Sequence, residues 1–181
     1  DMSDLIDSAV CNDVRELYQK LFSKFGRSEK ALCWSKNKQS IRFNSLTDAI
    51  KIHQLSSFSI LDYGCGLGDL YFYLNNIYQT RMNYSGVDIT PAFIDSNNET
   101  FSNVNFELIK SCSNVEKQYD FVILSGVFNL LYSKNRENHQ EIVYDILTHL
   151  FKKTTIALSV DFMTDEVDFQ QEGAFHQNPI E

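Results

Sequence analysis

Hydrophobic and polar positions follow two different periods along the chain, and the two periods alternate. Short apolar runs are typical of parallel strands buried on both faces, whereas apolar residues three or four positions apart mark one face of a helix. Because strands alternate with helices and crossovers are right-handed, we expect an α/β fold with a parallel sheet in the strand order 3-2-1-4-5. The predicted strands cover residues 58–61, 84–89, 104–109, 121–124 and 155–160, and the predicted helices cover residues 8–25, roughly 38–54, 67–78, 91–100 and 142–151.

A run of glycines lies where the first predicted strand turns into a helix, in the sequence Gly64-Cys65-Gly66-Leu67-Gly68. Glycine adopts positive φ without strain and lets a ligand approach the main chain. The free N–H groups at the start of the helix add an electropositive end. We interpret this turn as the contact surface for a cofactor, with an ordinary tight turn as the alternative.

The glycine spacing and two acidic residues indicate what kind of cofactor fits. The dinucleotide fingerprint is G-x-G-x-x-G, and at its third glycine position this chain has Asp69, whose carboxylate would repel a pyrophosphate. A second acid, Asp62, stands just before the turn. Two acids beside the turn suit a ligand that carries an ammonium or a sulfonium group.

Two further strand ends carry residues suited to the same ligand. Asp88 ends the second predicted strand, and a carboxylate there can accept hydrogen bonds from ribose hydroxyls. Thr90 and Pro91 follow as the expected N-cap and first residue of a helix. The small residues Ser125 and Gly126 directly follow the predicted strand over residues 121–124 and leave room for a ligand at its end.

These three stretches, in this order, resemble motifs I, II and IV of the class I S-adenosylmethionine (SAM)-dependent methyltransferases. The resemblance implies a Rossmann-like, doubly wound sheet, SAM as the cofactor, and Ile89 packed on the adenine. It also implies one more helix and two strands after the fifth strand. The sequence ends too early for them, and a shortened chain or a minimal version of the fold are the alternatives. The implied cofactor contacts in these motifs are Asp62, Gly64, Cys65, Gly66, Asp69, Asp88, Ile89, Ser125 and Gly126.

Residues 31–43 look like those of a bacterial small-domain branch of this family. The resemblance implies that Trp34, Gln39 and Arg42 border the SAM pocket, where Arg42 could pair with the methionyl carboxylate. For Trp34 a loop anchor and a lid are equal alternatives, and for Arg42 an exposed structural arginine is the alternative.

The end of the third predicted strand departs from the family. The family often places an acid there that binds the adenine amino group, and this chain has residues 110–114, Lys-Ser-Cys-Ser-Asn, instead. We therefore expect Ser111, Cys112 or a backbone group to replace that acid.

No residue stands out as a general base. Methyl transfer depends mainly on positioning of the acceptor, and a base helps only for a hydroxyl or ammonium acceptor. Asp161, after the fifth strand, and His176 are the two weak candidates for a catalytic residue, although a flexible tail is expected for His176. We expect His139 to lie at the surface.

Length, charge and cysteine content restrict the function further. The 181 residues, 43% of them hydrophobic, indicate one domain over residues 1–181 with residues 1–56 as an N-terminal helical cap. The net charge of −8 argues against nucleic acid, since phosphate binding needs a basic surface. The cysteines at positions 11, 33, 65 and 112 show no metal-ligand spacing, and no apolar run is long enough for a bilayer.

We therefore expect a cytoplasmic methyltransferase for a small-molecule acceptor, with no metal and no membrane partner. Two alternatives stay open. One is a SAM-binding protein without catalysis, such as a partner or regulatory subunit. The other is a nicotinamide-dependent oxidoreductase, against which the glycine spacing and Asp69 argue.

Overall fold

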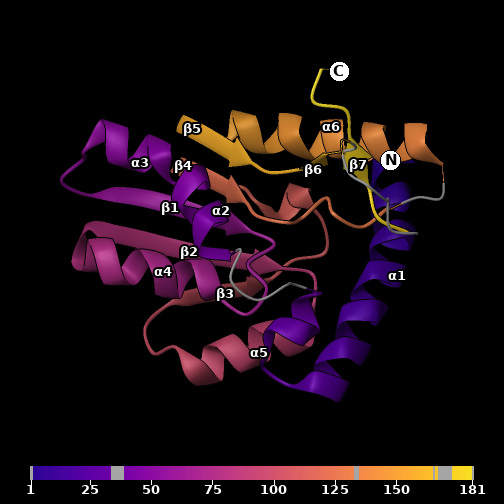
Figure 1. Cartoon of the computed structure of the whole chain (residues 1–181), viewed down its shortest axis with the longest axis horizontal. Helices are drawn as coiled ribbons and strands as arrows, with labels where there is room; N and C mark the ends of the chain where they lie inside the picture. The colour runs from indigo at the N-terminus through magenta and orange to yellow at the C-terminus, as the bar shows by residue number, and fades with distance from the viewer. Residues whose placement is uncertain (1, 34–38, 133–134, 165, 167–172, 181) are drawn as a thin grey trace.

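A five-stranded parallel sheet forms the centre of the computed structural model, which describes residues 2–33, 39–132, 135–164, 166 and 173–180 (Figure 1), and residues 2–11 by their backbone only. The strand order is β3-β2-β1-β4-β5, as the sequence predicts. All four neighbouring pairs are parallel. The strands are β1 (Phe58–Tyr63), β2 (Met82–Asp88), β3 (Asn105–Leu108), β4 (Tyr119–Leu124) and β5 (Thr154–Val160).

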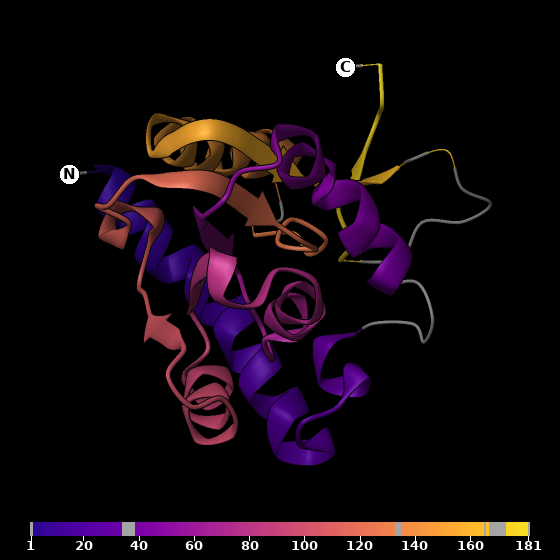
Figure 2. The same cartoon turned by 90° about the vertical axis from the view of Figure 1, so that its left-hand side faces the viewer.

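Helices cover both faces of this sheet (Figure 2). On one face Phe58, Ile60 and Phe121 pack against α2 (Gln39–Leu46), α3 (Asp48–His53), α4 (Asp69–Tyr78) and part of α5 (Pro91–Thr100). On the other face Leu61 and Val122 pack against α6 (Arg136–Lys152). Neighbouring residues of one strand point to opposite faces, so strands with continuous apolar sequences fill both layers. The predicted doubly wound fold is therefore confirmed.

The long helix α1 (Met2–Phe25) crosses the carboxyl end of the sheet (Figure 1). Arg15 on α1 donates a hydrogen bond from Nε to the backbone oxygen of Ile89, the residue after β2, over 2.9 Å. Aromatic side chains of α1 pack around the fully buried Phe93 of α5. The helix is thus attached to the sheet at the point where β2 ends.

Short elements complete the described chain. The 3-10 helices are η1 (Glu29–Leu32), η2 (Gln79–Arg81) and η3 (Cys112–Asn114). After β5, the strands β6 (Met163–Thr164) and β7 (His176–Gln177) form a small parallel pair. A bridge between Leu130 and Ala174 brings the last described residues against the segment that follows β4.

Three helix predictions differ clearly from the structure in their bounds, and the first is α1, which begins at Met2 and not at residue 8. The helix expected over roughly 38–54 is two helices, because the chain breaks at Thr47, whose hydroxyl donates back to the Phe43 carbonyl over 2.7 Å. Helix α6 begins at Arg136 and not at 142. The Asn135 side chain caps it by accepting hydrogen bonds from the N–H groups of Glu137 and Asn138.

Candidate functional site

A cleft lies along the carboxyl ends of β1, β2 and β4, the edge where open parallel sheets bind ligands. It consists of two adjoining hollows that share Leu32, Gly64, Gly66 and Ser125. The larger hollow contains about 710 Å³ of empty space, part of it open to solvent, and the smaller one about 340 Å³.

The larger hollow has mostly apolar walls. Helix α1 provides Val14 and Tyr18, and the end of β2 provides Asp88. An apolar pocket with few polar groups suits a flat ring system with a hydroxylated attachment. The other apolar and aromatic residues of its wall are Tyr63, Ile89, Phe93, Ile109, Val127, Tyr132 and Ile146.

The smaller hollow is more polar and lies beneath α2. Its wall includes Gln39 and Phe43 of α2, and the two acids Asp62 and Asp69. Cys65 and Leu70 complete it on the side of the glycine turn. Two carboxyl groups in one small hollow favour a cationic ligand group.

The glycine turn presents bare backbone to both hollows. Gly64 and Gly66 have φ of 77° and 52°, a region that L side chains rarely adopt. A Cβ at Gly64 would stand 2.7 Å from Cγ2 of Val127, and one at Gly66 would stand 3.0 Å from Cδ2 of Leu32. The N–H of Gly64 bonds to the Val87 carbonyl over 2.8 Å, which fixes the turn to β2.

Asp88 is placed where the motif predicts it, at the last position of β2 and only 7% exposed. Its Oδ2 accepts a hydrogen bond from the N–H of Gly66 over 2.9 Å, and its Oδ1 accepts one from the N–H of Thr90 over 2.8 Å. Burial raises the pKa of this carboxyl, and the backbone N–H groups of Gly66 and Thr90 partly offset that effect. A carboxylate oxygen has two lone pairs, so each oxygen can still accept from a ligand.

Asp62 lies deeper, with 2% of its surface exposed. Its Oδ2 accepts a hydrogen bond from the Tyr84 hydroxyl over 2.5 Å. Burial raises the pKa of Asp62 to about 7; the Tyr84 hydrogen bond lowers it, while Asp88 and Asp69 raise it. The carboxyl group therefore titrates near neutral pH in the wall of the smaller hollow.

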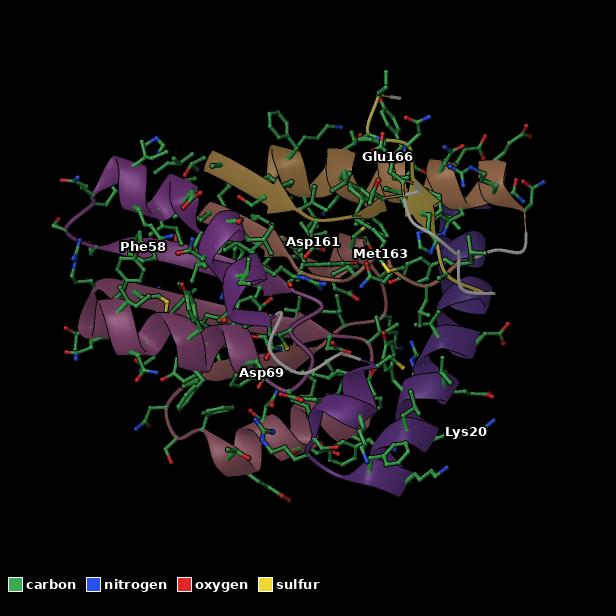
Figure 3. All side chains as sticks on the ribbon, viewed as in Figure 1. Lys20, Phe58, Asp69, Asp161, Met163 and Glu166 are labelled. Carbon is green, nitrogen blue, oxygen red and sulfur yellow. The ribbon has the colours of Figure 1, made fainter. Side chains whose placement is uncertain are left out.

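Helix α2 is connected to the cleft by two polar contacts with acids on different segments of the chain. Gln39 Nε2 donates to Oδ2 of Asp69 over 2.9 Å, and Arg42 Nε lies 3.2 Å from Oδ2 of Asp161. Figure 3 labels both acids, Asp69 at the start of α4 and Asp161 beyond the end of β5. Arg42 is not in the wall of either hollow, and Trp34 lies outside the described residues.

The two candidates for a catalytic residue lie outside the cleft wall. Asp161 accepts the Gly126 N–H over 2.6 Å and the Ser125 hydroxyl over 3.5 Å, so it supports two expected cofactor contacts from behind. His176 is 7% exposed in β7, where its Nδ1 lies 2.8 Å from the Thr164 carbonyl. The expected flexible tail for His176 is therefore wrong, because the segment folds back onto the chain.

The expectation that His139 lies at the surface is also wrong. His139 is fully buried in α6, 4.2 Å from the Phe175 ring between centroids. Its Nδ1 accepts the backbone N–H of Tyr132 over 3.0 Å. Burial, with a smaller effect of Arg136, lowers its pKa to about 4. The residues just before His139 are polar and exposed, so the sequence did not indicate that this one residue faces the core.

Of the replacements expected for the missing acid after the third strand, the side chains of Ser111 and Cys112 do not line the cleft, and the backbone group stays a prediction. Ser111 and Asn114 cap η3 by bonding to each other's backbone. The neighbouring Ile109 is in that wall.

Sequence reasoning missed two residues that hold the glycine turn. The fully buried Asn97 donates from Nδ2 to the Gly66 carbonyl over 2.8 Å. Arg27 donates to the Leu67 carbonyl and, over 3.0 Å, to Oδ1 of Asn97. Asn97 could have been found, because it lies at helical spacing from the apolar residues Phe93 and Ile94 and so on the same helix face. No local sequence pattern indicates a role for Arg27.

The described part of the chain contains no group of three or more histidine, cysteine or acidic residues placed to hold a metal ion. Within the same residues, no helix has the length and apolar character needed to cross a membrane.

Comparison with known proteins agrees with this architecture. A family model described as a methyltransferase domain matches residues 55–178, whereas no curated protein matches the chain. The plantazolicin methyltransferase BpumL, solved with a pentazolic desmethylPZN analog and SAH, has a TM-score of 0.58 at 18% identity, covering 92% of this chain and 68% of its own. WbdD has a TM-score of 0.58 at 17% identity, and the match covers 90% of this chain and 37% of the WbdD chain.

The sugar N-methyltransferase KedS8 from Streptoalloteichus sp ATCC 53650 has a TM-score of 0.50 at 13% identity, covering 85% of this chain and 57% of its own. At these identities the solved structures show a shared fold, and this chain spans from about a third to two thirds of their lengths. The family model covers well over half of the chain and includes the glycine turn and Asp88. The chain therefore belongs to the methyltransferase-domain family, the class I SAM-dependent group that its motifs resemble.

Proposed function

We propose that this protein transfers a methyl group from SAM to a small-molecule acceptor. The observation that carries the proposal is the placement of the Gly64–Gly66 backbone and the Asp88 carboxylate in the wall of one cleft. The methyltransferase-domain match supports the reaction type.

The residues of the cleft fit the parts of SAM. Asp88 has lone pairs left for the ribose hydroxyls, and the apolar wall with Ile89 and Ile109 suits the adenine. The acids Asp62 and Asp69 in the smaller hollow suit the methionyl ammonium and the sulfonium charge. The side-chain-free turn at Gly66 leaves the main chain open to contact.

The chemistry divides between cofactor and protein. SAM supplies a methyl group that is already electrophilic, because it is bonded to a sulfonium. The protein then has to hold and orient the acceptor, and positioning of this kind can contribute roughly 7–11 kcal/mol to lowering a barrier. Among the described residues of the cleft wall there is no histidine or lysine to act as a general base. We infer that Asp161 holds the two cofactor contacts Ser125 and Gly126 in place.

Two observations support a small-molecule acceptor. The net charge of −8 disfavours a polyanionic substrate such as nucleic acid. The solved structures of similar fold include a plantazolicin methyltransferase and a sugar N-methyltransferase, by their own descriptions.

The second candidate is a SAM-binding partner or regulatory protein without catalysis. It is favoured by one observation, that both Asp161 and His176 lie outside the cleft wall. A turnover assay for S-adenosylhomocysteine across a panel of sugars, phenols, amines and peptides separates the two. Calorimetric binding of SAM without product for any acceptor class would favour the non-catalytic protein.

The test of the cofactor site is Asp88→Asn, with Asp95→Asn on the exposed side of α5 as the matched control. Asparagine keeps one acceptor oxygen for the turn but loses the negative charge. Hydrogen bonds to charged groups contribute about 1.5–3 kcal/mol each, so affinity for SAM and S-adenosylhomocysteine should fall at least about tenfold by calorimetry. Wild-type affinity in a folded Asp88→Asn protein would refute the ribose role. Mass spectrometry of the ligand that co-purifies with the wild type identifies the cofactor independently.

A further inference from the structure

Tyr18 of α1 is a polar group in the cleft that neither the glycine turn nor the strand ends explain. It lies in the wall of the larger hollow together with Gly66 and Asp88. Its ring packs on Phe93, with centroids 5.7 Å apart and planes at 57°. The hydrogen bond from Arg15 to Ile89 fixes α1 one residue beyond Asp88. The position of the Tyr18 ring is therefore set by two contacts of its own helix.

The hydroxyl of Tyr18 makes no hydrogen bond within the described part of the chain, and its residue is half-buried at the cleft. Burial raises the pKa of Tyr18, and Cys33 and Asp88 raise it further, so the hydroxyl keeps its proton near neutral pH. A ligand in the cleft can supply the missing acceptor.

Asp88 offers the complementary group on the same hollow. Its two oxygens each accept one backbone N–H and retain capacity for more, and the group donates nothing while it is ionised. A ligand hydroxyl can donate to Asp88 and at the same time accept from Tyr18, because a hydroxyl has both functions. A ligand ammonium group has no lone pair to accept with and a thioether has no proton to donate, so neither can satisfy both groups in this way.

We propose that Tyr18 and Asp88 form a donor–acceptor pair that binds one hydroxyl of a vicinal diol. This inference rests on the proposed function, and under it the diol is the ribose of the cofactor. Tyr18 is then a ligand-binding residue that the N-terminal helix adds to the site formed by the sheet.

The test combines Tyr18→Phe with S-adenosylhomocysteine and its 2′-deoxy and 3′-deoxy analogues, by calorimetry. Phenylalanine keeps the ring that packs on Phe93, so the melting temperature should stay close to that of the wild type. The exposed Tyr144 of α6 provides the control variant Tyr144→Phe. A lost hydrogen bond costs about 1.4 kcal/mol or somewhat less, so S-adenosylhomocysteine should bind Tyr18→Phe about 3–10-fold more weakly.

The analogues identify the hydroxyl. One of them should bind wild-type protein and Tyr18→Phe with equal affinity, because it lacks the hydroxyl that Tyr18 contacts, whereas the other should show the full loss. Equal binding of S-adenosylhomocysteine to wild type and Tyr18→Phe overturns the pair while the proposed function stands. A loss of the same size for all three ligands also overturns it, and places the Tyr18 contact on another group. Wild-type protein that binds none of the three overturns both the proposed function and the pair.

Discussion

Replacing Asp62 by asparagine tests whether a buried carboxyl limits the stability of the ligand-free protein. The pKa of Asp62 rises from its ordinary value of 3.8 to about 7, chiefly through burial. Between these values the folded state holds a proton that the unfolded state has released, so stability decreases as pH rises from about 4 to about 7. One pKa unit corresponds to about 1.36 kcal/mol, and the part of this effect between about pH 5 and pH 8 amounts to about 2–3 kcal/mol.

Asp62→Asn removes the charge but keeps an oxygen that can accept the Tyr84 hydroxyl. The free energy of unfolding, from urea titrations at about pH 5 and about pH 8, should therefore favour the variant over the wild type by about 2–3 kcal/mol more at the higher pH. Asp145→Asn, at an exposed position of α6, should follow the wild type at both pH values. Parallel pH profiles for wild type and Asp62→Asn would refute the assignment of a raised pKa to this group.

Two further changes address the glycine turn and α6. Gly66→Ala should cost about 1–2 kcal/mol of stability because φ is positive there, and the S-adenosylhomocysteine-induced rise in melting temperature should disappear. The control is Gly26→Ala, at φ of 60° with open space around it, which should lose stability through backbone strain but keep the ligand-induced rise in melting temperature. An unchanged ligand-induced rise in Gly66→Ala would show that the turn is not the cofactor site. The pKa of His139 is lowered from 6.5 to about 4 in the folded protein. Between these pH values the unfolded state binds a proton that the folded state does not, so the free energy of unfolding of the wild type should decrease as pH falls through this interval. In His139→Gln, whose amide oxygen can accept the Tyr132 N–H, melting curves from about pH 7 to about pH 4 should lack this loss, and an identical profile would contradict it.

Local patterns in the sequence were sufficient for the sheet and for the position of the cleft. Stretches of four to six residues, some of them apolar runs and some with apolar and polar residues mixed or alternating, identified all five strands of the main sheet. The alternation of these strands with helices predicted their order, since parallel strands need right-handed crossovers. The same alternation placed the glycine turn and Asp88 at one edge, because carboxyl ends of parallel strands lie together. These features depend on residues that are close in sequence, and periodicity reports on such residues directly.

Only the tertiary structure decided which polar groups meet. Asp161 stood at a strand end and looked available for catalysis, yet Gly126 and Arg42 occupy its oxygens from segments 35 residues before it and further. Asn97 reaches Gly66 across 31 residues of sequence, and Tyr18 reaches the cleft because α1 folds back over the end of β2. Hydrogen bonds between distant segments depend on how helices pack on the sheet. The periodicity of a single sequence predicts where each helix lies and which face it buries, but it does not predict which hydrogen-bond partner a polar side chain has after the helices pack on the sheet.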